Sequence, residues 1–332
     1  MNYSPVEIRS FSLLGQRGTF GKIVCDLAEK DDRIYAMTAD QGAGAATKRF
    51  QEKFPERFLN FGISEQNAVG VCAGMANEGL IPFVAFQAVF ASIRAADQVR
   101  VMMSYMSLPV KLVGIFAGVT QSDCGPTHFA LQDIALFRAF PNVTIISPAD
   151  GLETALAIEA AATVDAPVYI RLSGETNIPM VYRENYKFEI GRAITLKDGK
   201  DICIFATGSM VHSAIKIAKR LEESIGDLSV RVVDLHTISP LDVTTVRDSM
   251  ECKFVVSMEE HSVHGGLGGA IAEVFALEVN KPPLLIIGTP DHYVHAGEYR
   301  DVLEDYGLSE DQMYKRIFER YALLNNRKEN RQ

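Results

Sequence analysis

The sequence has few cysteines and no long apolar run, and both features narrow its class. Its five cysteines are scattered, odd in number and form no C-x-x-C pair, so neither a disulfide framework nor a zinc site is predicted. No segment approaches the roughly eighteen consecutive apolar residues that suggest a membrane span. The first ten residues, MNYSPVEIRS, lack the basic start and the apolar run of a secretory signal. We therefore expect a cytoplasmic protein without a membrane-spanning segment.

Positive charge is also scarce. The 332 residues include 33 Lys and Arg against 42 Asp and Glu, which gives a formal charge of −9, and the basic residues form no cluster. Proteins that bind nucleic acid draw much of their affinity from clustered Lys and Arg side chains that contact phosphates. A nucleic-acid partner is therefore not expected.

What the sequence does contain is an alternation of short β-rich runs with longer helical patterns. This alternation is typical of an α/β fold with a mostly parallel sheet, and a chain of this length is long enough for two domains. In the first part of the chain we expect strands at 33–38, 57–62, 81–86, 110–117, 143–148 and 167–173, and helices near 13–30, 64–78, 88–106, 127–139 and 150–164.

The apolar periodicity breaks between residues 174 and 200, in a stretch rich in Pro, Gly, Asn and charge. Such a composition is typical of a domain linker. Beyond it, β-rich runs return at 201–208, 229–235, 252–260 and 282–290. The sequence thus predicts a first domain over residues 1–185 and a smaller α/β domain over residues 186–332, whose charged tail at 325–332 is expected to be a solvated end.

Glu65 opens a helical run of small apolar residues, in NFGISEQNAVGVCAGMANEG at 60–79. Its carboxyl group has two interpretations. Following a plausible N-cap, Ser64, it is a first-turn acid that the helix dipole stabilises. Alternatively, because the helix behind it is apolar all round, the carboxyl group points into a dry place and hydrogen-bonds a ring nitrogen of a ligand.

His128 follows a Gly-Pro turn in SDCGPTHFALQD and begins a helical pattern. It either closes the loop or carries protons near neutral pH. The second interpretation is attractive because strand-to-helix loops are where open α/β sheets bind ligands.

Two further histidines, His261 and His264 in EEHSVHGG, have a two-residue gap and acids beside them. No third ligand is apparent, so a structured turn is favoured over a metal site. The GGLGG run that follows lacks the third glycine of the dinucleotide fingerprint, because Ile271 stands there. A Rossmann dinucleotide site is therefore disfavoured, and no metal site is predicted in this chain.

Three phenylalanines, Phe83, Phe86 and Phe90, are most simply core aromatics, although one of them could offer its face to a flat cofactor ring. Asp40 ends the first expected strand in the glycine-rich MTADQGAGA. It is interpreted as a turn residue, yet the carboxyl end of a strand is also where ligands are met.

Five segments carry a family resemblance, in order and over most of the chain. They are RFLNFGISEQNAVGVCAGMANEGLIPFVAF, CGPTHFALQDIALFRAFPNVTIISPAD, APVYIRLSGE, VVDLHTISPLD and VVSMEEHSVHGGLGGAIAEVFA. Together they resemble the pyrimidine-binding and C-terminal domains of transketolase, a thiamine-diphosphate-dependent transferase. The resemblance implies transfer of a two-carbon ketol unit from a ketose donor to an aldehyde acceptor.

A complete transketolase also has an N-terminal half, whose G-D-G and downstream Asn hold the diphosphate and its Mg²⁺ or Ca²⁺. This sequence contains no G-D-G. It therefore resembles the second subunit of a split transketolase, which is active only with an N-terminal partner subunit. The Mg²⁺ or Ca²⁺ ion would be bound mainly by that partner. In this family the cofactor lies between two protomers, which implies an α2β2 heterotetramer.

The resemblance assigns two catalytic residues and their neighbours. Glu65 matches the acid that bonds N1′ of the cofactor's aminopyrimidine, and His128 matches the histidine that handles hydroxyl protons of the substrate. Phe90 matches the ring-stacking phenylalanine, and Asp40 matches an acid that lies against the cofactor.

Three more positions match cofactor-binding positions of the family: Gln41, Ile63 and Ile93. Gln41 stands where a bulky apolar residue often supports the bent form of the cofactor. Gln87 and Ile93 replace aromatics that flank it in many relatives.

The implied substrate-binding residues are His128, Cys124, Phe116 and Arg171, and several of them depart from the family pattern. Cys124 replaces an Asp that recognises the C2 hydroxyl of the sugar, and a thiol is a far weaker partner. Phe116 replaces a histidine, and no second basic residue follows Arg171, although both usual positions help to hold a substrate phosphate. We therefore expect ketol transfer in which one substrate is not the usual phosphorylated sugar.

Three alternatives remain open at this stage. A 2-oxoacid dehydrogenase β subunit shares the fold and the need for a partner, but its relatives lack G-P-T-H. A deoxyxylulose-phosphate-synthase-like enzyme resembles a single long chain with its own diphosphate motif. A non-catalytic binding subunit would keep the fold without turnover.

Overall fold

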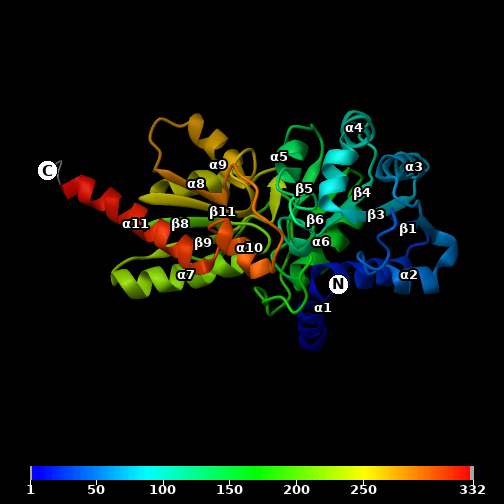
Figure 1. The fold of residues 1–332 in the computed structure, drawn as a ribbon, viewed down its shortest axis with the longest axis horizontal. Coiled ribbons are helices and arrows are strands. Elements are labelled where there is room, and N and C mark those ends of the chain that lie inside the picture. Colours follow the sequence, from blue (N-terminus) through cyan, green and yellow to red (C-terminus); the bar gives the residue numbers. More distant parts are fainter. Residues whose placement is uncertain (1, 330–332) are drawn as a thin grey trace.

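The computed structural model describes residues 2–329, with side chains described up to residue 325. Its two α/β domains lie side by side along the long axis of the molecule, the first drawn from blue to green and the second from yellow-green to red (Figure 1). The prediction of an α/β fold with two domains is confirmed. Residues 330–332 of the second predicted domain, which include the end of the charged tail, lie outside the described residues.

The first sheet has seven strands in the order β10-β5-β6-β4-β3-β1-β2. All neighbours are parallel except β10, which pairs antiparallel with β5. The strands are β1 (Ile34–Thr38), β2 (Phe58–Asn60), β3 (Ile81–Gln87), β4 (Lys111–Ile115), β5 (Thr144–Ile146), β6 (Val168–Arg171) and β10 (Thr237–Ser239). The first six confirm the strands expected from the sequence.

Helices cover both faces of this sheet, which is why its central strands are apolar on both sides. Because side chains alternate along a strand, Phe83 of β3 packs into the cluster with α1 (Pro5–Ala28) and α6 (Gly151–Thr163), whereas Phe86 packs into the cluster with α3 (Glu65–Asn77). Both rings are fully buried, so their prediction as core aromatics is confirmed. The helices are α1 (Pro5–Ala28), α2 (Lys48–Lys53), η1 (Pro55–Arg57), α3 (Glu65–Asn77), η2 (Phe90–Arg94), α4 (Ala96–Gln98), η3 (Val99–Tyr105), η4 (Ser122–Cys124), α5 (Asp133–Arg138) and α6 (Gly151–Thr163).

Helix α1 begins eight residues earlier than expected. The Ser4 hydroxyl accepts the Glu7 N–H and the Glu7 carboxylate accepts the Ser4 N–H, which is a capping box, and Pro5 occupies the first turn. These start signals favour a helix here. At Gly15 the helix kinks with φ of 69°, and a Cβ atom there would lie 2.1 Å from the carbonyl oxygen of Glu175, so only glycine fits.

The second sheet has five strands in the order β12-β11-β8-β9-β7. Strands β12, β11, β8 and β9 run parallel, and β7 pairs antiparallel with β9 at the edge. The elements are β7 (Ile194–Lys197), β8 (Ile202–Ala206), α7 (Met210–Ile225), β9 (Val230–Asp234), α8 (Val243–Asp248), η5 (Ser249–Glu251), β11 (Phe254–Ser262), α9 (Leu267–Ala276), β12 (Leu284–Thr289), α10 (Tyr299–Asp305) and α11 (Glu310–Glu329). Strand β7 lies inside the stretch expected to be a linker, so that expectation was wrong for residues 194–197.

The two domains also share a sheet edge, because β10 belongs to the second half of the chain but pairs with β5 of the first sheet. The predicted boundary between residues 185 and 186 falls in the described segment 172–193, which contains neither helix nor strand. The exact boundary stays a prediction. Among residues 2–329, no helix has both the length and the apolar character needed to cross a membrane.

Candidate functional site

The candidate site lies at the carboxyl ends of four neighbouring strands, β2, β1, β3 and β4. The residues that follow these strands are Glu65 after β2, Asp40 and Gln41 after β1, Phe90 after β3, and Phe116, Cys124 and His128 after β4. Parallel strands end at the same edge of a sheet, and this is the edge at which open α/β sheets bind ligands. The fold therefore brings residues from four separate segments to one edge.

Glu65 is the first residue of α3 and is only 2% exposed. The hydroxyl group of Ser64 does not cap the helix but donates to the carbonyl oxygen of Phe61 at 2.7 Å. Behind Glu65 the helix buries small side chains, including Ala68 and Cys72. The carboxyl group thus lies in the sheltered position that the sequence pattern suggested.

Arg94 is the partner of this carboxyl group, and sequence reasoning missed it. Its Nη1 donates to Glu65 Oε1 at 2.8 Å and to Oε2 at 2.9 Å. Its guanidinium carbon lies 4.0 Å from the ring centroid of Phe90, over the ring face. Phe90 and Arg94 begin and end the π-helical turn η2. Their four-residue spacing, which places both side chains on one helical face, is the signal that would have found Arg94.

His128 completes this group. Its ring centroid lies 5.5 Å from that of Phe90, with an interplanar angle of 74°. Its Nδ1 lies 2.9 Å from the hydroxyl of Thr127. Glu65, Arg94, Phe90 and His128 therefore form one contiguous set of side chains, three of which were expected to act together.

The donor and acceptor chemistry of this set fits an aminopyrimidine ring. The guanidinium group of Arg94 is planar, carries N–H donors, stacks on Phe90 and hydrogen-bonds the buried carboxylate of Glu65. A protonated or amino-substituted pyrimidine is also planar and would make the same two contacts. At the end of β3, the side-chain oxygen of Gln87 is buried and has no hydrogen-bond partner among the described residues, and a buried acceptor in this state calls for a donor.

A second cluster at the same edge contains Gln41 and Phe116. Both side chains lie against Gly44, where an added Cβ would come 3.0 Å from Gln41 Oε1 and 3.2 Å from the Phe116 ring. The guanidinium of Arg17 covers Phe116 at 4.1 Å and donates to the carbonyl oxygens of Gly44 and Gly174. Phe116 is thus packed between Gly44 and Arg17, and its uncharged ring cannot pair with a substrate phosphate.

The remaining predicted positions are exposed. Asp40 has a φ of 58°, and its N–H binds the side chain of Asn60 at 2.9 Å, which is consistent with a turn residue because Asp tolerates the left-handed region. Ile63 and Ile93 are 75% and 55% exposed, although both are large apolar residues. The Cys124 thiol is exposed as well.

Arg171, by contrast, points into the interior. Its Nε donates to Asp133 at 2.8 Å, and its Nη2 donates to the carbonyl oxygens of Ala130 and Glu260. Asp133 also accepts the hydroxyl of Tyr169. This geometry gives Arg171 a structural role that links the two domains, and we leave it out of the proposed substrate site.

The two histidines of the EEHSVHGG motif separate in the structure. His261 lies inside β11 and is fully buried, and only His264 occupies the turn that was expected for both. Burial lowers the pKa of His261 to about 4, so its ring is neutral. Burial raises the pKa of the neighbouring Glu259 to about 7, although this carboxyl group accepts two N–H groups at the start of α9. Among the described residues, no group of three or more His, Cys, Asp and Glu side chains could hold a metal.

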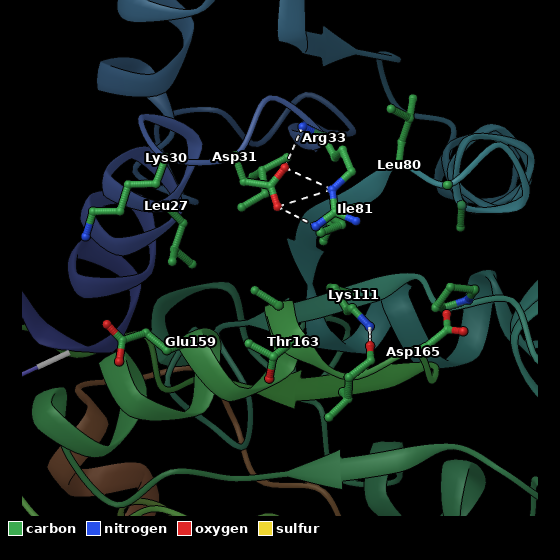
Figure 2. A pocket seen from close by; sticks show the side chains of 16 residues that line it. Leu27, Lys30, Asp31, Arg33, Leu80, Ile81, Lys111, Glu159, Thr163 and Asp165 are labelled. Atoms are coloured by element: carbon green, nitrogen blue, oxygen red, sulfur yellow. Dashed lines mark hydrogen bonds and ion pairs between the residues drawn. The ribbon is translucent and has the colours of Figure 1, made fainter.

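A cavity of about 720 Å³ lies at the opposite edge of the first sheet, where β1, β3 and β4 begin. Figure 2 shows Arg33 paired with Asp31 on one side of it and Lys111 on the other. The Lys111 ammonium group donates to the carbonyl oxygens of Val164 and Ala166, both at 2.7 Å, and burial lowers its pKa to about 8. Because these charged groups already have partners and the cavity lies at the amino ends of the strands, we do not place the active site there.

Two family models match this chain. The pyrimidine-binding domain of transketolase matches residues 15–177, and the C-terminal domain of transketolase matches residues 191–313.

Among curated proteins, the chain is 38% identical over 306 residues to a putative transketolase C-terminal section of Methanocaldococcus jannaschii, covering 92% of this chain and 96% of the relative. It is 34% identical to one of the subunits of the apulose-4-phosphate transketolase of Phocaeicola vulgatus, covering 93% of this chain and 98% of that subunit. Among solved structures, it is similar to an inactive beta4 tetramer of a split-gene transketolase, with a TM-score of 0.81, 38% identity and coverage of 91% and 96%.

Proposed function

This chain belongs to the transketolase family, and on that premise we propose that it is the pyrimidine-binding subunit of a split, thiamine-diphosphate-dependent transketolase. The observation that carries the proposal is the group of Glu65, Phe90 and His128 at the carboxyl edge of the first sheet. It provides a buried acid, an aromatic face and a proton carrier next to one another. A 2-oxoacid dehydrogenase β subunit is not favoured by the relatives.

Each of the three side chains has a defined task in this proposal. Thiamine diphosphate, when bound, supplies the nucleophilic carbon and the electron sink of ketol transfer. Glu65 holds the aminopyrimidine through a hydrogen bond that its burial strengthens. Phe90 supports the plane of the ring. His128 accepts and returns protons at the substrate hydroxyls, because one nitrogen of a neutral imidazole ring accepts a hydrogen bond and the other donates one.

The proposal requires a partner. The sequence lacks the G-D-G that holds the diphosphate and its Mg²⁺ or Ca²⁺, and the relative from Phocaeicola vulgatus is itself one subunit of a transketolase. Ile63 and Ile93 flank Glu65 and Arg94 in sequence and expose large apolar surfaces, which an N-terminal subunit would cover. We propose an α2β2 heterotetramer of this kind, located in the cytoplasm, in keeping with five free cysteines.

The substrate is proposed to differ from the usual phosphorylated pair. Phe116 is covered by Arg17, Arg171 is turned inward, and Cys124 is the exposed residue where the family has an acid. One relative is a subunit of an apulose-4-phosphate transketolase, whose name gives a substrate other than xylulose 5-phosphate and ribose 5-phosphate. We expect a ketose donor and an aldehyde acceptor, at least one of them outside the common pair.

The test is a reconstitution. The chain is co-purified with a partner subunit that carries G-D-G and a downstream Asn, and ketol transfer is assayed with a panel of ketoses and aldehydes. We expect transfer that depends on both subunits and on thiamine diphosphate, with low rates on xylulose 5-phosphate and ribose 5-phosphate. Ordinary transketolase rates on that pair would contradict the substrate proposal.

A matched variant separates catalysis from scaffolding. Glu65→Gln keeps the shape of the side chain but cannot hold a charge, so it should abolish turnover while leaving the assembly intact by size-exclusion chromatography. Turnover at the wild-type rate in this variant would favour a non-catalytic subunit.

A further inference from the structure

Arg94 occupies the position that the proposed function gives to the cofactor ring. Its guanidinium lies over the face of Phe90 at 4.0 Å and donates to both carboxylate oxygens of Glu65. Glu65 is the acid that would receive the aminopyrimidine, and a planar ring that bonds Glu65 while it stacks on Phe90 would use the face that Arg94 covers. The contact therefore resembles a bound ligand supplied by the chain itself.

Arg94 and the aminopyrimidine cannot both be bound, chiefly because both would stack on the ring of Phe90. A carboxylate has about four lone-pair sites and could accept a second donor. The face of Phe90, however, has room for one planar group at stacking distance, because a second group would have to pass through the first. Binding of the pyrimidine at Phe90 thus requires that Arg94 leave.

Arg94 is able to leave. Its side chain is 41% exposed, whereas that of Glu65 is 3% exposed, so the guanidinium reaches the acid from the solvent side. Among the described residues, its hydrogen bonds all go to Glu65 and its only ring contact is Phe90. Within that part of the chain, these two contacts are what hold the guanidinium group in the site.

The exchange of Arg94 for the pyrimidine keeps the buried carboxylate of Glu65 paired. A buried carboxylate without a partner is strongly unfavourable, and Arg94 supplies that partner. When a pyrimidine that carries a proton on its ring nitrogen donates to Glu65 in place of Arg94, the carboxylate is again paired, so one donor replaces another and the buried charge never lacks a partner.

We infer that Arg94 is a displaceable internal ligand of the pyrimidine site, which competes with thiamine diphosphate for Glu65 and Phe90 and so sets the affinity for the cofactor. The inference rests on the proposed function. A binding site that is open only part of the time shows an affinity reduced by the open fraction. Charged hydrogen bonds of this kind shift an equilibrium by about ten- to a hundredfold, so the affinity should be reduced by a similar factor.

The experiment measures cofactor binding rather than turnover. Thiamine diphosphate with Mg²⁺ is titrated by calorimetry into the reconstituted pair, without substrate, for the wild type and for Arg94→Gln, which removes the cation. We expect Arg94→Gln to bind about ten- to a hundredfold more tightly. Arg94→Lys, which keeps the charge but lacks the planar group, should fall between the two.

Arg100→Gln is the matched control. Arg100 lies on η3, is paired with Asp97 on the surface and does not contact Glu65. Arg100→Gln removes one positive charge from the same helical region, so the affinity of this variant for thiamine diphosphate should equal that of the wild type. A gain in Arg100→Gln equal to that in Arg94→Gln would assign the effect to general charge and overturn the inference.

Equal or weaker binding by Arg94→Gln would overturn the inference while leaving the proposed function in place, since the wild-type pair would still bind the cofactor. Absence of binding in the wild-type pair and in all variants would overturn both. If Arg94→Gln does not fold, Arg94→Lys decides: tighter binding supports displacement, and unchanged or weaker binding contradicts it.

Discussion

Replacing Arg171 with methionine should destabilise the protein rather than alter substrate binding. The Arg171 side chain is buried, and it donates to Asp133 and to the carbonyl oxygens of Ala130 and Glu260. Methionine retains much of the buried volume but none of the donors. Among the described residues, the variant would leave the buried carboxylate of Asp133 with the Tyr169 hydroxyl as its remaining hydrogen-bond donor.

The expected loss in the free energy of unfolding follows from these contacts. Removing one member of a buried ion pair costs about 3–5 kcal/mol, because the other charge stays buried and unpaired. Each of the two carbonyl oxygens that lose a donor adds on the order of 1 kcal/mol. Because the terms share one guanidinium they overlap, and we expect a total of about 4–6 kcal/mol. The double variant Arg171→Met with Asp133→Asn should recover part of this loss, since it removes both charges.

The assay is urea unfolding of the purified subunit, followed by far-UV circular dichroism, together with KM measurements on the reconstituted pair. A large fall in the free energy of unfolding is expected in the single variant. Wild-type stability combined with a raised KM would refute the reasoning, because it would mean that Arg171 faces the substrate.

Three further predictions follow from the same structure. Burial raises the pKa of Asp234 to about 7, so the folded protein retains a proton that the unfolded chain releases above about pH 4. Asp234 therefore makes the free energy of unfolding fall as pH rises between about 4 and 7. Asp234→Asn should remove that contribution, measured by urea titrations at several pH values. A stability difference between the two proteins that is independent of pH would contradict this. Ile63 is 75% exposed, and Ile63→Asp should weaken association with the partner subunit at least about tenfold, measured by calorimetry; unchanged affinity would show that the partner does not cover it. The Tyr299 hydroxyl donates to the buried Glu260 at 2.8 Å, so Tyr299→Phe should lower the free energy of unfolding by about 1–3 kcal/mol, and no change in urea midpoint would argue against this bond.

The fold was predictable where short apolar runs alternate with helical patterns. The six strands of the first domain and the four parallel strands of the second are apolar runs flanked by helical patterns, so their residue types alone predict them. Strands β10 and β7 lie at sheet edges, and each pairs antiparallel with one neighbour. Both strands depend on pairing with a strand that is distant in the sequence, and no local sequence pattern predicts such pairing.

The site was predictable in part. Glu65, Phe90 and His128 were expected to act together, and the structure places them in one group with Arg94. The inward turn of Arg171 was not predictable, because its partner Asp133 lies 38 residues away and the two side chains meet only in the folded chain. Charged residues near a predicted site therefore cannot be assigned to a ligand from their sequence position alone.

The most direct measurement for the central claim is the structure of the reconstituted pair with thiamine diphosphate bound. We predict that N1′ of the aminopyrimidine lies within hydrogen-bond distance of the Glu65 carboxyl group, about 2.7–3.2 Å, with the ring over Phe90. A pyrimidine ring bound elsewhere in the assembly, remote from Glu65, would contradict it.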